Sequence, residues 1–279
     1  MEKMKLGIVG FGFMGHCDAD MMATFDDIDL VAVADTNPEQ LKDAPEGVET
    51  YANIDEMLAN ADINVVMVST PNPSHPEMVK KAAAAKKHVI CEKPAAMSVA
   101  EYDEMVAACE ENGVIFTVHQ QRRWDKDYRI MKEVYDKSMV GDMYIIKSQL
   151  YGVNGNMHDW HIYPEMGGGM LYDWGVHLID QMLDMVKSKI VSLYADVQNV
   201  INENVDDYFN IIMKFENEGD KDFVLNTDAA RVEQVLINLL KNATKFTSRG
   251  SITLGYKVDK ENKPVSYTHL RAHETVLDL

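Results

Sequence analysis

The sequence predicts an α/β protein that begins with a doubly wound parallel sheet. Short apolar runs recur along the first 121 residues, and helical patterns separate them. Each run is nearly continuous in apolar residues, which is typical of strands that helices cover on both faces. Because strands that alternate with helices usually pair in parallel, we expect residues 1–121 to form one doubly wound domain.

The expected elements follow one another in a regular order. The strands are Lys5–Val9, Leu30–Ala34, Val65–Val68, His88–Cys91 and Val114–Val118. The helices are a stretch that runs from the first glycine-rich turn to about Phe25, then Ile54–Asn60, Ser74–Ala85 and Ser98–Asn112. Ligands bind at the carboxyl ends of the strands in sheets of this kind, so the residues that follow each strand are the first candidates for function.

A glycine-rich turn joins the first strand to the first helix. It consists of Gly10, Phe11, Gly12, Phe13, Met14 and Gly15, and Asp35 follows 20 residues later. This context predicts a dinucleotide site, because Gly10 allows a tight turn, Gly12 lets the backbone approach a pyrophosphate and Gly15 permits close helix packing. Asp35 can bind a ribose and would repel a 2′-phosphate, so NAD is preferred to NADP. The alternative is a glycine turn that binds no ligand.

Two further segments end strands at the same edge of the sheet. The residues expected at the cofactor are Thr70, Pro71 and Asn72 after the third strand, and Glu92 and Lys93 after the fourth. Lys93 is a cation fixed between a buried strand and a proline, which favours a catalytic role. Two neighbours have structural explanations: Cys91 as a packed small apolar residue, and His75 as part of the loop or helix start.

A glycine run in the second region precedes another pair of candidate residues. Gly167–Gly169 is followed by a helix that holds Asp173 and His177. Their i, i+4 spacing places both side chains on one helical face, where a carboxylate can orient an imidazole. A lone helical histidine is more often structural, but the pair beside a glycine run favours acid/base catalysis.

Taken together, these motifs resemble those of the Gfo/Idh/MocA family of NAD(P)-dependent oxidoreductases. The resemblance is carried, in order, by GFGFMG, Asp35, Thr70–Asn72, Cys91–Pro94 and the GGGMLYDWGVH segment at 167–177. It covers residues 1 to about 219. It implies an N-terminal Rossmann domain over 1–121, a truncated α+β open-sheet substrate domain over 122–219, and a homo-oligomer for the intact family member.

The resemblance also implies an activity and roles for three residues. The activity is hydride transfer between nicotinamide and a sugar, inositol or related polyol. The lysine matching Lys93 contacts substrate and nicotinamide ribose, the histidine matching His177 is the acid/base, and the acid matching Asp173 helps to bind substrate. Alcohol oxidation needs such a base and cation, and the cofactor carries the hydride. The alternatives are a redox-neutral NAD-dependent glycosidase of the same superfamily and a non-enzymatic NAD-binding product.

Residues between the two motif-bearing regions supply further candidates for substrate binding. Arg122 and Arg123 follow the fifth strand, and Arg123 is the candidate for the pocket, with ion pairing to the acidic surface as the alternative. Trp160 lies in a stretch rich in aromatic residues and histidines that is typical of a substrate loop. His158 and His161 in that stretch are spaced like metal ligands, but no further ligands converge in the sequence, so we expect no metal.

Composition excludes several classes of protein. The 279 residues carry a net charge of −18, which argues against a nucleic-acid partner and suits a small-molecule substrate. The three cysteines form no CxxC pair, so a disulfide scaffold is excluded. No apolar run approaches the ~18 residues of a membrane span, and the N-terminus does not resemble a signal peptide. We therefore expect a cytoplasmic protein that does not bind membranes.

The composition changes near Gly219. All 19 methionines lie within residues 1–213, and after Gly219 nine basic residues stand against eight acidic ones. Residues 220–263 resemble a histidine-kinase ATPase fragment, with a helix over Thr227–Thr247 and a strand over Gly250–Val258. The glycine-rich ATP boxes that should follow are missing, so an amphipathic helix that binds no nucleotide is the preferred interpretation. Residues 264–279 resemble a translated adapter or vector tail. We expect a chimera, with a natural fusion as the rival explanation.

Overall fold

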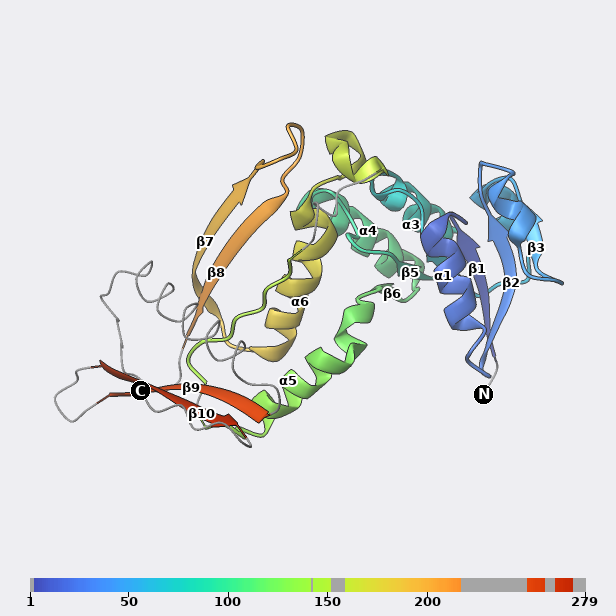
Figure 1. Cartoon of the computed structure of the whole chain (residues 1–279). Helices are drawn as coiled ribbons and strands as arrows, with labels where there is room; N and C mark the ends of the chain where they lie inside the picture. Colours follow the sequence, from blue (N-terminus) through green and yellow to red (C-terminus); the bar gives the residue numbers. More distant parts are fainter. Residues whose placement is uncertain (1–2, 142, 152–158, 217–249, 259–263, 273–279) are drawn as a thin grey trace. The chain divides into compact units, whose positions relative to one another are not determined.

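The computed structural model describes residues 3–141, 143–151, 159–216, 250–258 and 264–272. The chain divides into two compact units, Met1–Asn217 and Glu218–Leu279. The first unit contains a six-stranded parallel sheet and a two-stranded antiparallel sheet (Figure 1). The α/β class predicted from the sequence is therefore confirmed.

The parallel sheet has a doubly wound strand order. Its strands are β1 (Met4–Val9), β2 (Ile28–Ala34), β3 (Glu49–Tyr51), β4 (Val65–Val68), β5 (His88–Cys91) and β6 (Phe116–Val118). They lie in the order β3-β2-β1-β4-β5-β6. The order reverses between β1 and β4, and the carboxyl ends of these two strands are the place where such sheets bind ligands. The sequence did not predict β3, a short and largely exposed strand with no apolar run.

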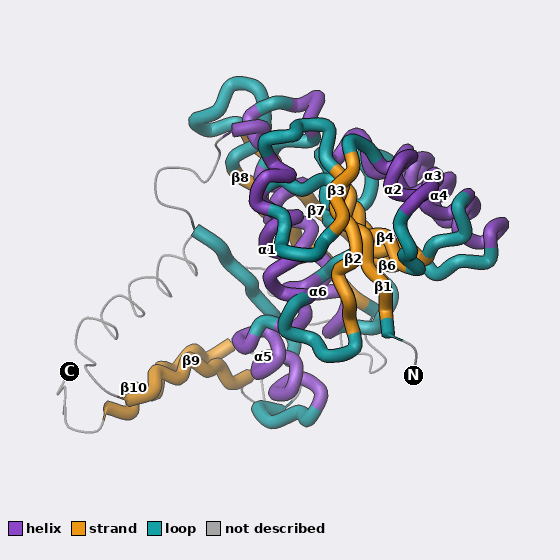
Figure 2. The backbone as a smooth tube through the Cα atoms, turned by 90° about the vertical axis from the view of Figure 1, so that its right-hand side faces the viewer, coloured by secondary structure: helices purple, strands orange, loops and turns teal. Residues whose placement is uncertain are grey.

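Helices cover both faces of this sheet. They are α1 (Phe13–Met22), α2 (Ile54–Asn60), α3 (His75–Ala84) and α4 (Val99–Asn112). In Figure 2, α1 lies on one side of the strands and α2, α3 and α4 on the other. Along β4, Val65 and Met67 pack in the cluster on the α1 side, whereas Val66 and Val68 pack in the opposite cluster. Two-sided burial explains why the strands are continuous in apolar residues, since each large side chain buried contributes about 1.5–3 kcal/mol.

The rest of the first unit begins with helix α5 (Lys126–Asp136). A π-helical turn, Leu171–Gly175, leads into α6 (Val176–Met185), and the antiparallel pair β7 (Ile190–Gln198) and β8 (Tyr208–Phe215) follows. The Tyr128 hydroxyl of α5 donates to the Asp184 carboxylate of α6 at 2.6 Å. The Asp206 carboxylate, just before β8, accepts from the backbone N–H of Leu171 at 2.7 Å. These bonds fix the π-helical turn and α6, which carry two of the candidate residues.

In the second unit, the structure describes β9 (Gly250–Val258) paired antiparallel with β10 (Pro264–Ala272). The first of these strands has the bounds expected from the sequence. The kinase-like helix expected over Thr227–Thr247 lies outside the described residues. Within the described part of the chain, no helix is long and apolar enough to cross a membrane.

Candidate active site

The glycine-rich turn after β1 has the geometry of a dinucleotide site. Gly10 has a φ of +86°, and a Cβ there would lie 2.6 Å from the backbone of the loop after β4. A Cβ on Gly15 would lie 2.2 Å from the Gly10 carbonyl oxygen. Gly12, by contrast, has no atom within 4 Å of the position of a Cβ, so the space beside it is open. That open space before the N-terminus of α1 fits a pyrophosphate.

Asp35 fixes the same turn from the end of β2. Its two carboxylate oxygens accept the backbone N–H groups of Phe11 and Asn37, each at 2.7 Å. Each oxygen keeps a lone pair that a ribose hydroxyl can use. The Phe11 side chain is buried against His16, so Phe11 offers the site its backbone only. Phe13 is 82% exposed.

The loops after β4 and β5 are held together by a buried histidine. The ring nitrogens of His75 lie 2.7 Å from the carbonyl oxygen of Thr70 and 2.9 Å from that of Pro94. Burial lowers the pKa of His75. The structural interpretation of His75 is thus confirmed. Asn72, also buried, donates to the carbonyl oxygen of Gly167 at 3.3 Å, which ties the β4 loop to the glycine run.

Lys93 and Asp173, which are 80 residues apart in the sequence, form a half-buried ion pair. The Lys93 Nζ atom lies 2.8 Å from Asp173 Oδ1 and 3.1 Å from the Asp173 carbonyl oxygen. The structure therefore brings together the strand-end lysine and the acid that the sequence singled out. Asp173 lies in the π-helical turn rather than in a regular helix, and such turns are frequent at functional sites.

His177 is the third member of the site and is only 3% exposed. Its Nδ1 atom lies 3.2 Å from the side-chain oxygen of Gln120. The expectation that Asp173 orients this ring is corrected, because Asp173 binds Lys93 and the ring is hydrogen-bonded to Gln120. Since the amide oxygen only accepts, Nδ1 carries the proton and Nε2 keeps its lone pair. Burial, followed by the charges of Lys93 and Arg122, lowers the pKa of His177 to about 3.

The structure gives the two neighbouring arginines different surroundings. Arg123, the expected substrate ligand, makes a two-pronged ion pair with Asp180 of α6 at 2.7 and 2.6 Å. Its guanidinium is thus engaged away from the Lys93 group. The Arg122 guanidinium lies 4.1 Å from the centre of the Trp174 ring and close enough to lower the pKa of His177. Of the two, Arg122 lies nearer the candidate site.

Trp160 is connected to the site through its neighbour His161. The two rings stack with centroids 3.8 Å apart. The Nε2 atom of His161 lies 3.9 Å from Asp173 Oδ2, so the expected aromatic stretch reaches the ion pair. His158, the other histidine considered as a metal ligand, lies outside the described residues.

The sequence did not predict some residues of the site. It predicted Glu92 as a cofactor-binding residue, but the Glu92 side chain contacts a half-buried histidine instead. Glu92 is buried, with its Oε1 atom 2.5 Å from His119 Nδ1, so its side chain faces into the domain. His119, Gln120 and Asp18 were not predicted. His119 and Gln120 directly follow β6, so the rule that selected Lys93 would have selected them too. Cys91 is fully buried, as expected.

Comparisons with known proteins agree with this geometry. Residues 4–120 match the oxidoreductase family with an NAD-binding Rossmann fold, and residues 128–239 match the GFO/IDH/MocA C-terminal domain. The chain belongs to the GFO/IDH/MocA family. The prediction of an NAD-binding Rossmann domain is therefore confirmed. The C-terminal match continues past Gly219 to residue 239, so the kinase-like and adapter-like segments find no support here and stay predictions.

Individual members of the family are similar over the same region. An oxidoreductase of Schizosaccharomyces pombe is 33% identical over 67% of this chain and 52% of its own length. Myo-inositol 2-dehydrogenase of Thermotoga maritima is 26% identical over 72% of this chain and 60% of its own. The crystal structure of an NAD-binding protein from Listeria innocua has a TM-score of 0.75 and 35% identity, covering 80% of this chain and 68% of that one. The chain thus spans little more than half the length of these two curated relatives.

The lowered pKa of His177 predicts a loss of stability in acid. Between its ordinary value of 6.5 and about 3, the unfolded chain binds a proton that the folded chain excludes. The free energy of unfolding should therefore fall as the pH drops through this window. In His177→Gln the fall should be shallower, as measured by urea unfolding at successive pH values. His88→Gln, at the start of β5, is the control, and equal slopes for wild type and His177→Gln would contradict the assignment.

Proposed function

We propose that this chain is an NAD-dependent oxidoreductase that transfers a hydride between the nicotinamide and a sugar, inositol or related polyol. The observation that carries the proposal is the grouping of an ammonium, a carboxylate and a neutral imidazole from Lys93, Asp173 and His177 at the carboxyl edge of the sheet. The names of several relatives, such as myo-inositol 2-dehydrogenase, support the substrate class.

The cofactor would be held by the turns already described. The N-terminus of α1 and the open side of Gly12 suit the pyrophosphate, and Asp35 suits the adenosine ribose. The loop Thr70–Asn72 lies beside Gly10, next to the same turn. When bound, the nicotinamide ring supplies the hydride chemistry.

The chain's own residues provide the proton chemistry. Nε2 of His177 accepts the hydroxyl proton of the substrate, because the ring is neutral at pH 7 and Nδ1 is occupied by Gln120. The Lys93 ammonium stabilises the negative charge that develops on the substrate oxygen. Asp173 holds Lys93 in place and has a second oxygen to accept a hydrogen bond from another hydroxyl group. We assign substrate binding to Asp173 and His177, and Trp160 borders them.

Turnover by the full chain tests this function. Lys93→Met and His177→Asn should each lower the rate of NAD⁺ reduction on a panel of inositols and sugars by about 10²–10⁴-fold, since each removes a group needed in the transition state. Lys80→Met, which removes an exposed lysine of α3, is the control. Variants that keep the full rate would contradict the assignment.

The same assay separates the alternatives. Glycoside cleavage without net NADH formation would identify the redox-neutral glycosidase. One relative, 30% identical over 64% of this chain, is named 2,7-anhydro-N-acetylneuraminate hydratase, so names in the family are not confined to dehydrogenases. NAD binding without turnover of any substrate would identify a non-enzymatic product.

Asp35 should make the chain prefer NADH to NADPH. A relative 27% identical is named scyllo-inositol 2-dehydrogenase (NADP(+)), so both cofactors occur among the relatives. A carboxylate at this position repels a 2′-phosphate, and fluorescence titration should give the lower dissociation constant for NADH. Asp35→Asn should reduce the difference between the dissociation constants of NADH and NADPH, and the amide oxygen can still accept the Phe11 N–H. Asp43→Ala, on the exposed surface, should leave that difference unchanged. Tighter NADPH binding by the wild type would overturn the preference.

We also propose that residues 220–279 do not complete the substrate domain. The change in composition after Gly219 supports this, as does the division of the chain at Asn217. The full chain should then scatter light as an aggregate or lack activity, because β8 would keep an unpaired edge. Expression of residues 1–219 beside the full chain tests the proposal. If a soluble, active full chain loses both properties on truncation, the tail is a working part of the fold.

A further inference from the structure

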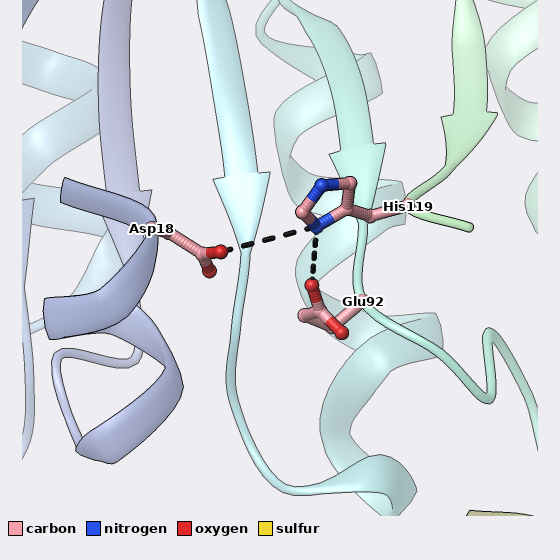
Figure 3. A group of neighbouring side chains, drawn as sticks. All are labelled: Asp18, Glu92 and His119. Atoms are coloured by element: carbon pink, nitrogen blue, oxygen red, sulfur yellow. Dashed lines mark hydrogen bonds and ion pairs between the residues drawn. The ribbon is translucent and has the colours of Figure 1, made fainter. Parts of the chain in front are cut away.

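Three ionisable side chains meet inside the first domain, away from the open side of the site. They are Asp18 of α1, Glu92 after β5 and His119 after β6, and Figure 3 shows the imidazole between the two carboxylates. The His119 Nδ1 atom lies 2.5 Å from Glu92 Oε1 and 3.8 Å from Asp18 Oδ1. Asp18 is fully buried, and its Oδ1 atom has no hydrogen-bond partner among the described residues. We call these three residues the buried triad.

The electrostatics of the buried triad favour holding a proton. Burial raises the pKa of Asp18 to about 6, although its other oxygen accepts the Ser69 hydroxyl at 2.7 Å. Burial opposes a charge on His119, but the hydrogen bond to Glu92 and the two carboxylate charges outweigh it and raise its pKa. Burial and the nearby Glu92 charge therefore favour a proton on Asp18, and the two carboxylates favour one on His119.

A proton explains the geometry better than a metal ion does. The three ligand atoms lie within 4.8 Å of one another, and a nitrogen with two carboxylates is a reasonable donor set for Zn²⁺ or Mn²⁺. However, donors at about 2.0–2.2 Å from one ion stand roughly 3 Å apart. The His119 Nδ1 and Glu92 Oε1 atoms lie 2.5 Å apart, which is shorter than the usual ~2.7–2.9 Å of such a hydrogen bond and too close for two ligands of one ion.

The buried triad is linked to both candidate catalytic groups. The second oxygen of Glu92 accepts the backbone N–H of Lys93 at 3.2 Å. His119 directly precedes Gln120, whose side chain orients His177. On the opposite side, Asp18 belongs to the helix that begins at the glycine-rich turn.

We propose that Asp18, His119 and Glu92 share one proton that keeps Lys93 and Gln120 in position beside the cofactor turn. This inference rests on the proposed function. Loss of the proton adds a buried negative charge beneath α1, where the cofactor's anionic pyrophosphate would bind. The three are positioning residues, because they act through their neighbours.

Other titratable groups face the buried triad, and a test must distinguish their effects on stability from those of the triad. The charge of Glu92 acts on both His75 and Cys91, and His177 lies near enough to His119 for their charges to interact. The pKa values of His177 and Asp18 move in opposite directions, so their effects on stability have opposite signs. His177 lowers stability as the pH falls below 6.5, whereas Asp18 lowers it as the pH rises through about 6.

The test compares the full-length wild type with Asp18→Asn, an isosteric change that removes the charge. Asp20→Asn, on the exposed side of the same helix, is the matched control. Relative to Asp18→Asn, which lacks the titrating carboxyl group, the wild type should lose thermal stability as the pH rises through about 6. NADH should bind the wild type more weakly above this pH, and the step should be absent in Asp18→Asn. Glu92→Asp should restore binding lost in Glu92→Ala, because it again offers a carboxylate to His119.

Each outcome decides the proposal. If Asp18→Asn and Asp20→Asn both follow the wild-type pH profile, the shared proton is wrong. If added Zn²⁺ or Mn²⁺ raises the melting temperature of the wild type but not of Asp18→Asn, the triad is a metal site instead. If the wild type binds no NADH at any pH, the proposed function and the positioning step both fail, and the stability profiles still judge the shared proton by itself.

Discussion

The ion pair between Lys93 and Asp173 is the interaction on which the candidate site depends. It joins the end of a buried parallel strand to a turn that lies 80 residues further along the chain. The strand fixes the lysine because it is paired on both sides, and Asp206 and the α5–α6 contacts fix the turn. Without a carboxylate at this place, a half-buried ammonium would have no ion-pair partner.

Burial lowers the pKa of all three histidines around this pair, but the groups that face them differ. Lys93 and Arg122 each act on His177 more strongly than Asp173 does, so burial and charge both favour the neutral ring. His119 has carboxylates instead, and they outweigh burial and favour the charged ring. His75 has two carbonyl oxygens, and there burial prevails. The same residue type is therefore a neutral ring that we propose as the base, a ring whose charged form is favoured, and a structural link at one sheet edge, according to its neighbours.

The sequence predicted the sheet and most of the site because their signals are local. A strand buried on both faces leaves a continuous apolar run, and a helix that must pack closely on a turn leaves a glycine at a fixed place. The relation between Asp173 and His177 was not predictable in this way. A π-helical turn has more residues per turn than an α-helix, so the i, i+4 rule does not place the two side chains together. Arg123 pairs with Asp180, and Glu92 pairs with His119. Local spacing in the sequence cannot predict partners that lie so far apart along the chain.

The crowded glycine turn also determines where this family member can evolve. Side chains at Gly10 and Gly15 would collide with backbone, and Phe11 is committed to the core. A side chain at Gly12 would fit sterically but would occupy the space left for the cofactor. Within this turn, variation that alters cofactor affinity is therefore confined to Phe13 and Met14. In mutagenesis libraries, as in natural variation, only these two positions of the turn can be substituted to change cofactor binding without disrupting the fold of the turn.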